Sequence, residues 1–365
     1  MEVHITSKQI IKPSSSELHL LEPFKLSFLD QFSIRMYTPV ILFYAKPSGS
    51  NIDGSQFLDQ LKQSLSKALT QFYAAAGRLK NNLFITDFNE GVPYVEARVA
   101  GSLSDFIEQT EKLEAMNRLL PCPPYRYIQD PTTPQLAVQV NIFDCGGIAL
   151  ALCFFHKIFD GTTVYAFLNS WAAFSRGSNG EIPNPELLGA SSQLFPPIES
   201  MLESAALKSL IFNDGPRKMT KSFVFDANAI TTLVLKAKSK SLGIYSVPND
   251  PQVVLQGFKT MIKLVSHAEE MVSKGDVEWY LLSSWLNTLD GNEDFGWGES
   301  TLFSIPGIDS QNREMRNLMY LKNARQHRAI EAWVSLSEKE MGFLERDAHF
   351  LAFASPNSYS DKSKI

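Results

Sequence analysis

The histidine at position 156 is the side chain of this sequence best placed to transfer protons. His156 directly follows Ile148–Phe155, a continuously apolar segment that predicts a strand buried on both faces. The end of such a strand can hold a side chain in one rigid position. Because the ordinary pKa of histidine is about 6.5, a neutral imidazole there could accept a proton at neutral pH.

An aspartate follows His156 in the same short segment. Asp160 completes a His-x-x-x-Asp pattern, and Gly161 after it allows a sharp turn of the backbone. The pattern predicts a general base with a carboxylate in the same loop. Because this spacing also arises by chance, a second interpretation stays open, in which a buried histidine is simply satisfied by the neighbouring carboxylate.

A second motif, Asp294-Phe295-Gly296-Trp297-Gly298, has the composition of a tight turn around a large ring. Glycines on both sides of Trp297 let the backbone bend closely around a buried indole. Asp294 then requires a cation or N–H groups as partners, because an unpaired carboxylate is costly to bury. These residues are therefore predicted to be structural. The motif lacks the third glycine and the strand-to-helix setting of a phosphate-binding loop.

Alternating helix and strand patterns surround these motifs and predict an α/β fold. In the first half we expect a helix at 55–76, a hairpin of strands at 83–88 and 92–99, strands at 136–143 and 148–155 around a tight turn, and a helix after Gly161. In the second half we expect strands at 223–225, 277–285 and 330–337 and helices at 229–238, 252–274 and 338–347. Between the halves, the Gly-, Ser- and Pro-rich residues 176–217 indicate a crossover between two domains.

Composition argues against several classes of function. The 365 residues carry 34 basic and 39 acidic side chains, and the net charge of −5 favours neither nucleic acid nor an anionic membrane surface. Cys122, Cys145 and Cys153 lack the spacing of metal ligands and are expected to be small buried thiols in a reducing compartment. No secretory leader is recognisable, so we expect a cytoplasmic protein without a metal.

The two motifs, in this order, resemble those of the plant BAHD acyltransferases, acyl-CoA-dependent enzymes with an HxxxD and a DFGWG motif. Supporting stretches are Leu26–Gln31, Tyr73–Leu79, Leu194–Pro197 and Ile330–Val334. The sequence around the motifs is most similar to that of the vinorine synthase-like group, which acylates alkaloid and terpenoid alcohols.

This resemblance implies a two-domain fold like that of chloramphenicol acetyltransferase, with mixed sheets and a channel between the domains. Residues 1–180 would form the first domain with the HxxxD motif, 181–217 the crossover linker, and 218–365 the second domain with the DFGWG motif. A monomer is expected.

The reaction implied by the resemblance is transfer of an acyl group from acyl-CoA, with acetyl-CoA as the first expectation, to an alcohol of a plant specialised metabolite. His156 would be the general base, and the alcohol would attack the thioester directly, without an acyl-enzyme. Asp160 would turn away from the channel and orient the loop. The motif residues that would be structural are Asp294, Phe295, Gly296, Trp297 and Gly298.

The chain is shorter than the family pattern, and the missing residues fall near 240–250. The lost stretch normally includes a strand whose arginine pairs with the aspartate of the DFGWG motif. Asp294 is therefore expected to find a substitute cation or to be exposed to solvent. Two alternatives to an active enzyme stay open: a truncated, catalytically impaired family member, and a non-enzymatic binding protein that uses the same fold.

Overall fold

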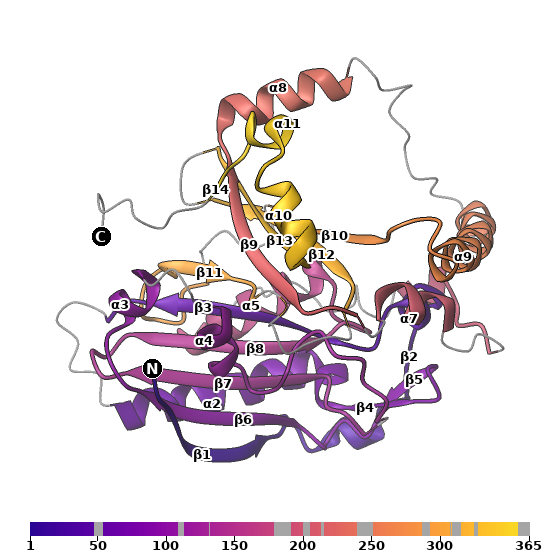
Figure 1. Ribbon diagram of the computed structural model, residues 1–365. Helices are drawn as coiled ribbons and strands as arrows, with labels where there is room; N and C mark the ends of the chain where they lie inside the picture. The colour runs from indigo at the N-terminus through magenta and orange to yellow at the C-terminus, as the bar shows by residue number, and fades with distance from the viewer. Residues whose placement is uncertain are drawn as a thin grey trace. The chain divides into compact units, whose positions relative to one another are not determined.

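The computed structural model describes residues 1–46, 54–108, 113–130, 132–178, 191–199, 205–212, 215–238, 251–286, 293–306, 308, 315–324 and 328–356. Contacts divide the chain into two compact units, each made of two segments. The first unit contains Met1–Glu203 and Thr288–Pro306, and the second contains Ser204–Asn287 and Gly307–Ile365. Both units combine helices and strands, as the α/β interpretation predicts (Figure 1).

A six-stranded mixed sheet forms the centre of the first unit, in the order β1-β6-β7-β8-β3-β11. Its strands are β1 (Val3–Ile11), β3 (Tyr37–Tyr44), β6 (Val92–Val99), β7 (Leu136–Phe143), β8 (Ile148–Phe155) and β11 (Leu302–Ser304). Strands β6 and β7 are parallel, and the other neighbours are antiparallel. Every residue of β8 is buried, so the apolar segment before His156 is confirmed as a fully covered strand.

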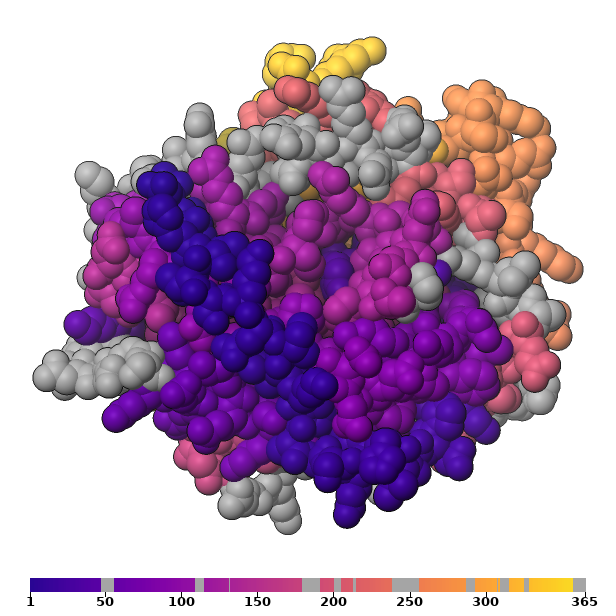
Figure 2. Space-filling model, turned by 90° about the horizontal axis from the view of Figure 1, so that it is seen from below, coloured from indigo at the N-terminus to yellow at the C-terminus, as the bar shows by residue number. Residues whose placement is uncertain are grey.

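Strand β1 forms one edge of this sheet and leaves many of its side chains exposed. Its atoms lie on the surface as the darkest indigo part of the chain in Figure 2. The register of its pairing with β6 shifts between Ile5 and Ser7. Irregular edges of this kind discourage pairing with other chains.

Two helices pack together in the first unit. Helix α2 (Gly54–Gln71) lies within the expected helix at 55–76 apart from its first residue, and it buries Leu61, Leu65 and Leu69. Helix α5 (Gly161–Ser175) packs on α2 through Trp171, whose indole N–H donates to the carbonyl of Leu61 at 3.3 Å. The ring of Phe167 in α5 also packs against β8, which fixes the helix to the strand that ends at His156. The shorter helices of this unit are η1 (Glu17–Leu20), α1 (Phe28–Phe32), η2 (Tyr73–Ala76), α3 (Leu103–Glu108) and α4 (Leu113–Arg118).

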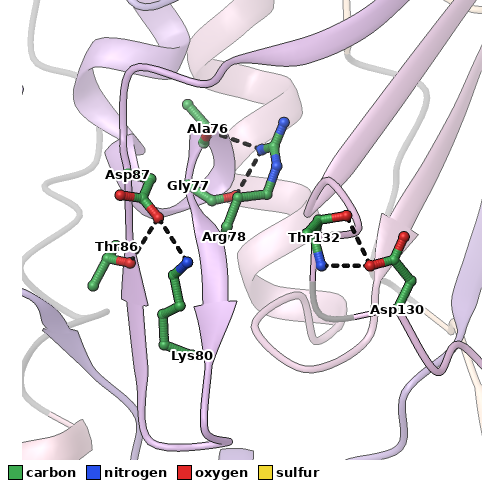
Figure 3. Close-up of polar contacts among 8 residues, drawn as sticks. All are labelled: Ala76, Gly77, Arg78, Lys80, Thr86, Asp87, Asp130 and Thr132. Atoms are coloured by element: carbon green, nitrogen blue, oxygen red, sulfur yellow. Dashed lines mark hydrogen bonds and ion pairs between the residues drawn. The ribbon is translucent and has the colours of Figure 1, made fainter.

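A small three-stranded sheet completes the first unit, in the order β2-β5-β4. Its strands are β2 (Phe24–Lys25), β4 (Arg78–Lys80) and β5 (Phe84–Thr86). Figure 3 shows the polar contacts that hold this region. The Arg78 guanidinium donates to the carbonyls of Ala76 and Gly77 at 3.2 and 2.9 Å, and so satisfies oxygens at the end of η2. Lys80 forms an ion pair with Asp87 at 3.1 Å.

The second unit is built on a five-stranded sheet, in the order β10-β12-β13-β9-β14. Its strands are β9 (Lys218–Phe225), β10 (Tyr280–Ser284), β12 (Asn317–Asn323), β13 (Ile330–Ser337) and β14 (Ser355–Pro356). Its helices are α7 (Ala205–Ile211), α8 (Ala227–Lys238), α9 (Pro251–Ser273), α10 (Glu338–Leu344) and α11 (Ala348–Leu351). A core of Phe223, Val334, Leu336 and Met341 joins β9, β13 and α10. Among the described residues, no helix is both long and apolar enough to cross a membrane.

The predicted hairpin around residues 89–91 is wrong. Strand β5 pairs with β2 and β4, whereas β6 pairs with β1 and β7 in the other sheet. Most side chains of β6 are buried, so this strand suits an interior position with partners on both sides. Cys145 also differs from expectation, because it is exposed in the β7–β8 turn, while Cys153 is buried and Cys122 half-buried.

The division into units differs from the expected domain boundaries. Residues 288–306, which the expected boundary places in the second domain, belong to the first unit. The physical reason is that β11 extends the main sheet by pairing with β3. The second unit begins at Ser204, inside the expected linker 181–217, of which 181–190, 200–204 and 213–214 lie outside the described residues. The expected deletion near 240–250 also lies outside them.

Candidate active site

His156 lines a cavity of about 300 Å³ in the first unit. The cavity has an apolar wall formed by Phe24, Leu29, Phe72, Ala74 and Ala75. Its polar lining residues are Asp30, Ser33, Lys157, Asp160, Thr163 and Ser191. An apolar concavity with a few convergent polar groups is the usual form of a site for a small molecule.

The imidazole of His156 is half-buried at the end of β8. The backbone N–H of His156 donates to the carbonyl of Met36 at 2.9 Å, which ties the residue to the segment before β3. Burial lowers the pKa of the ring below 6.5, while a hydrogen bond to its own backbone and the charge of Asp160 oppose that shift. The ring is therefore neutral at neutral pH, the state that a general base requires.

Ser33 is the side chain in direct contact with the imidazole. Its Oγ lies 3.3 Å from Nδ1 of His156 and donates to the backbone carbonyl of His156 at 2.6 Å. Ser33 is the C-cap of α1, and its own N–H donates to carbonyls of that helix. The end of helix α1 therefore holds the Ser33 hydroxyl in place beside Nδ1 of His156.

Lys157 anchors the loop that carries His156. Its side chain is buried, and Nζ donates to the carbonyls of Gln31 at 2.6 Å and Asp30 at 3.3 Å. These oxygens belong to the C-terminal turn of α1, where carbonyls lack helical partners and attract a cation. The other end of α1 is closed by a capping box between Ser27 and Asp30.

Asp160 turns to the helix that follows it. Its carboxylate accepts the N–H of Thr163 at 2.7 Å and caps α5, and the residue is exposed. Within the described chain it forms no hydrogen bond with His156. The alternative of a buried histidine satisfied by direct contact with this carboxylate is therefore not what the structure shows.

Asp294 has backbone amides as its partners. Its Oδ1 accepts N–H groups from Gly296, Trp297 and Gly298 at 2.7, 2.9 and 2.9 Å. Positive φ angles of 97° at Gly296 and 94° at Gly298 turn these amides inward, a backbone conformation that favours glycine. The half-buried carboxylate is thus satisfied within its own motif, and Arg176 donates to the backbone carbonyl of Asp294.

The two aromatic residues of the same motif join a ring cluster in the first unit. Trp297 packs edge-on against Tyr44 of β3, with ring centroids 4.9 Å apart, and against Phe57 of α2 at 4.5 Å. Phe295 packs against Trp171 of α5 at 5.0 Å. The DFGWG residues therefore link β3, α2 and α5, and none of them lines the cavity of His156.

The roles of Ser33 and Lys157 at His156 are not predicted from the sequence. Ser33 is 123 residues away from His156 along the chain, so no spacing connects the two. Lys157 directly follows His156, but its bonds to the carbonyls of α1 are contacts over 126 and 127 residues that no local pattern indicates. The only local signal was the pattern Ser27-x-x-Asp30, which predicts the start of a helix close to this position. Among the described residues, no group of three or more His, Cys, Asp or Glu side chains could hold a metal ion.

Comparison with known proteins gives consistent matches along the chain. A family model described as Transferase family matches residues 1–254 and 250–351. Akuammiline synthase 2 of Alstonia scholaris is 30% identical over 448 aligned positions, which cover 98% of this chain and 98% of that protein. Stemmadenine O-acetyltransferase of Catharanthus roseus is 29% identical over 417 positions, covering 95% and 97%.

Solved structures show the same fold. The crystal structure of vinorine synthase matches with a TM-score of 0.75 at 26% identity, and covers 98% of this chain and 100% of that one. The structure of TRI101 from F. graminearum, complexed with coenzyme A and T-2 mycotoxin, matches with a TM-score of 0.63 at 16% identity, covering 92% and 99%. These matches confirm the predicted two-domain α/β fold with mixed sheets.

Proposed function

The chain belongs to the Transferase family, the BAHD acyltransferases, and on this premise we propose that it transfers an acyl group from acyl-CoA to an alcohol, with His156 as general base. The observation that carries the proposal is the position of His156. The histidine of the HxxxD motif is neutral, lines a cavity, and is held by contacts to its backbone and its ring.

In the proposed reaction, the imidazole takes the proton of the acceptor hydroxyl as its oxygen attacks the thioester carbonyl. A tetrahedral oxyanion forms and collapses, the carbon–sulfur bond breaks, and the thiolate of CoA receives the proton from the imidazolium. The acyl group passes directly to the alcohol. None of the three cysteines lines the cavity of His156, in agreement with a mechanism that needs no acyl-enzyme.

Acetyl-CoA is the donor that we propose first, and the acceptor is an alcohol of a plant specialised metabolite. The name of stemmadenine O-acetyltransferase supports an acetyl donor, and the coenzyme A complex of TRI101 supports a CoA thioester. We also propose that the active protein is a cytoplasmic monomer. Its net charge of −5 favours small-molecule partners over nucleic acid or a membrane.

We further propose that the chain has an internal deletion near 240–250. Two observations support it. The alignment with akuammiline synthase 2 spans 448 positions although the chain has 365 residues, so many positions of that relative have no counterpart. The family model also matches in two segments that meet at residues 250–254.

A catalytically impaired family member is the second candidate, and the surface of the second unit favours it. Leu235 of α8, Leu264 of α9 and Leu282 of β10 are 64%, 62% and 65% exposed. These three elements follow one another along the chain, and α8 and α9 lie on either side of the proposed deletion near 240–250. A deletion that removed their cover would leave them in this state. A non-enzymatic binding protein is a third candidate that these observations do not specifically favour.

Thermal unfolding of the full chain with acetyl-, malonyl- or benzoyl-CoA tests the proposed donor site. A donor that binds only the native state at about 100 times its Kd adds about 2.7 kcal/mol to the free energy of unfolding. A cooperative transition that rises with one donor supports an acyltransferase. A transition that no donor moves contradicts the proposed CoA site and favours the impaired member.

A further inference from the structure

The contact between Ser33 and His156 constrains where the imidazole carries its proton. The Ser33 Oγ lies 2.6 Å from the backbone carbonyl oxygen of His156 and 3.3 Å from the ring nitrogen Nδ1. A serine hydroxyl has one proton to donate and two lone pairs that accept. A carbonyl oxygen can only accept, so the hydroxyl proton lies on the short contact to the carbonyl.

The lone pairs of the same Oγ are then left for the imidazole. A favourable contact with Nδ1 requires that this nitrogen be the donor, because two acceptors facing each other repel. The contact with the Ser33 Oγ therefore requires a proton on Nδ1. In the neutral ring this leaves Nε2 with its lone pair, and Nε2 has no hydrogen-bond partner among the described residues.

We propose that Ser33 is a positioning residue that fixes His156 in the Nδ1–H tautomer and thereby keeps Nε2 available as the proton acceptor. The tautomer is a property of the folded chain, whereas its catalytic use rests on the proposed function. Ser33 touches neither reacting atom in this scheme and acts only through the imidazole.

The surroundings of Ser33 explain why its hydroxyl can do this. Its backbone N–H is bonded to the end of α1, and Lys157 ties the same helix end to the loop of His156. On the other side, the carbonyl of Met36 accepts the N–H of His156. The segment from Ser33 to Met36 therefore holds the histidine at its N–H, its C=O and its ring, and the hydroxyl has little freedom to turn away.

Nuclear magnetic resonance of the full chain labelled with ¹⁵N-histidine tests the proposal without any substrate. Long-range ¹H–¹⁵N correlations distinguish the two neutral tautomers, and the signal that His156→Gln removes belongs to His156. Spectra are recorded near pH 8, above the ordinary histidine pKa of about 6.5. We expect the Nδ1–H pattern in the native chain and in Ser33→Thr, which keeps the hydroxyl. Ser33→Ala is expected to shift His156 toward the Nε2–H form.

Ser66→Ala is the matched control, because the Ser66 hydroxyl also donates to a backbone carbonyl, that of Lys12, at 2.6 Å. Among the described residues, the Ser66 hydroxyl forms no hydrogen bond with His156. It should leave the His156 signal unchanged. An Nε2–H pattern in the native chain would overturn the proposal, even if Ser33→Ala failed to fold. So would an unaltered Nδ1–H pattern in a folded Ser33→Ala, since the Ser33 hydroxyl would then not be what fixes the tautomer.

Kinetics supply a second readout once a donor and an acceptor are known. Ser33→Ala should lower kcat about ten- to a hundred-fold with little change in KM, less than the loss of the base itself. Ser33→Thr should restore most of the rate. Equal kcat in Ser33→Ala and the native chain would contradict the catalytic consequence. If the native chain transfers no acyl group, the proposed function fails, while the spectra still decide the tautomer.

Discussion

The carboxylate of Asp160 accepts the backbone N–H of Thr163 at 2.7 Å and makes no hydrogen bond with His156 in the described chain. The two residues of the HxxxD motif therefore have separate tasks. Both residues line the cavity, but Asp160 caps α5 and acts on the imidazole through its charge. We propose that Asp160 orients the loop through this cap.

Replacing Asp160 with alanine should destabilise the first unit through loss of the cap of α5. Such a loss costs about 1 kcal/mol, or about 2–4 °C in Tm for a unit of this size. Asp160→Asn keeps a capping oxygen and should unfold near the native Tm. Thermal unfolding of both variants is the measurement, and an equal loss in both would show that the cap is not what the carboxylate contributes.

Activity should fall with decreasing pH at a midpoint below the ordinary histidine value. The base must be neutral, and burial lowers the pKa of His156, so the ring is protonated only at pH below about 6.5. The charged groups around the same cavity are Asp30, Lys157 and Asp160. The acid limb of kcat/KM against pH measures this pKa in the free protein, and a midpoint above 6.5 would contradict the assignment.

Asp160→Asn should shift that acid limb to still lower pH. Burial lowers the pKa of His156, and the negative charge of Asp160 raises it. Removal of that charge should therefore lower the pKa of His156 further. Because the asparagine retains the cap, the shift separates the electrostatic effect from the structural one. An unmoved midpoint would mean that solvent screens the exposed carboxylate completely.

Loss of the Asp294 carboxylate should destabilise the loop of the DFGWG motif. Three N–H groups would lose their acceptor in Asp294→Ala, which we expect to cost about 1–3 kcal/mol because the site is half-buried. Asp294→Asn keeps an acceptor oxygen and should cost less. Asp105→Asn, at an exposed position of α3, is the control. The free energy of unfolding in urea is the measurement. Values for both Asp294 variants equal to that of the control would contradict a stabilising role of the three amide hydrogen bonds.

Trp297→Ala should destabilise the first unit by about 3–5 kcal/mol, because it removes a buried ring from the contacts with Tyr44 and Phe57. Trp297→Phe keeps an aromatic ring and should lose less. Since Trp297 does not line the cavity, a folded Trp297→Phe should retain its pH profile. A selective loss of kcat with an unchanged Tm would contradict a structural role for this tryptophan.

Local patterns were sufficient for the elements that present His156. The apolar run of β8, the turn before it and the helix after Gly161 each depend on neighbours in sequence, and each prediction is confirmed. The same holds for β13, whose bounds Ile330–Ser337 match the expected strand. Hydrophobic periodicity suits such elements because burial on one or both faces leaves its mark within a few residues.

Contacts over long sequence distances could not be predicted in this way. Strand β6 pairs with β1 rather than with the adjacent β5, and β11 crosses from the second half of the chain to join β3. Ser33 reaches His156 only because the folded chain brings α1 beside the end of β8. Periodicity describes which face of an element is buried, but it does not identify the partner that covers it.

The most direct test of the account is acyl transfer by the full chain, measured as release of the CoA thiol from acetyl-CoA with a panel of alkaloid and terpenoid alcohols. We expect turnover in the native chain and in the control His349→Ala, whose histidine is exposed in α11. His156→Ala should lose about 10²–10⁴-fold in kcat while its Tm stays close to the native value. Equal rates in His156→Ala and the native chain would contradict the assignment of His156 as the base.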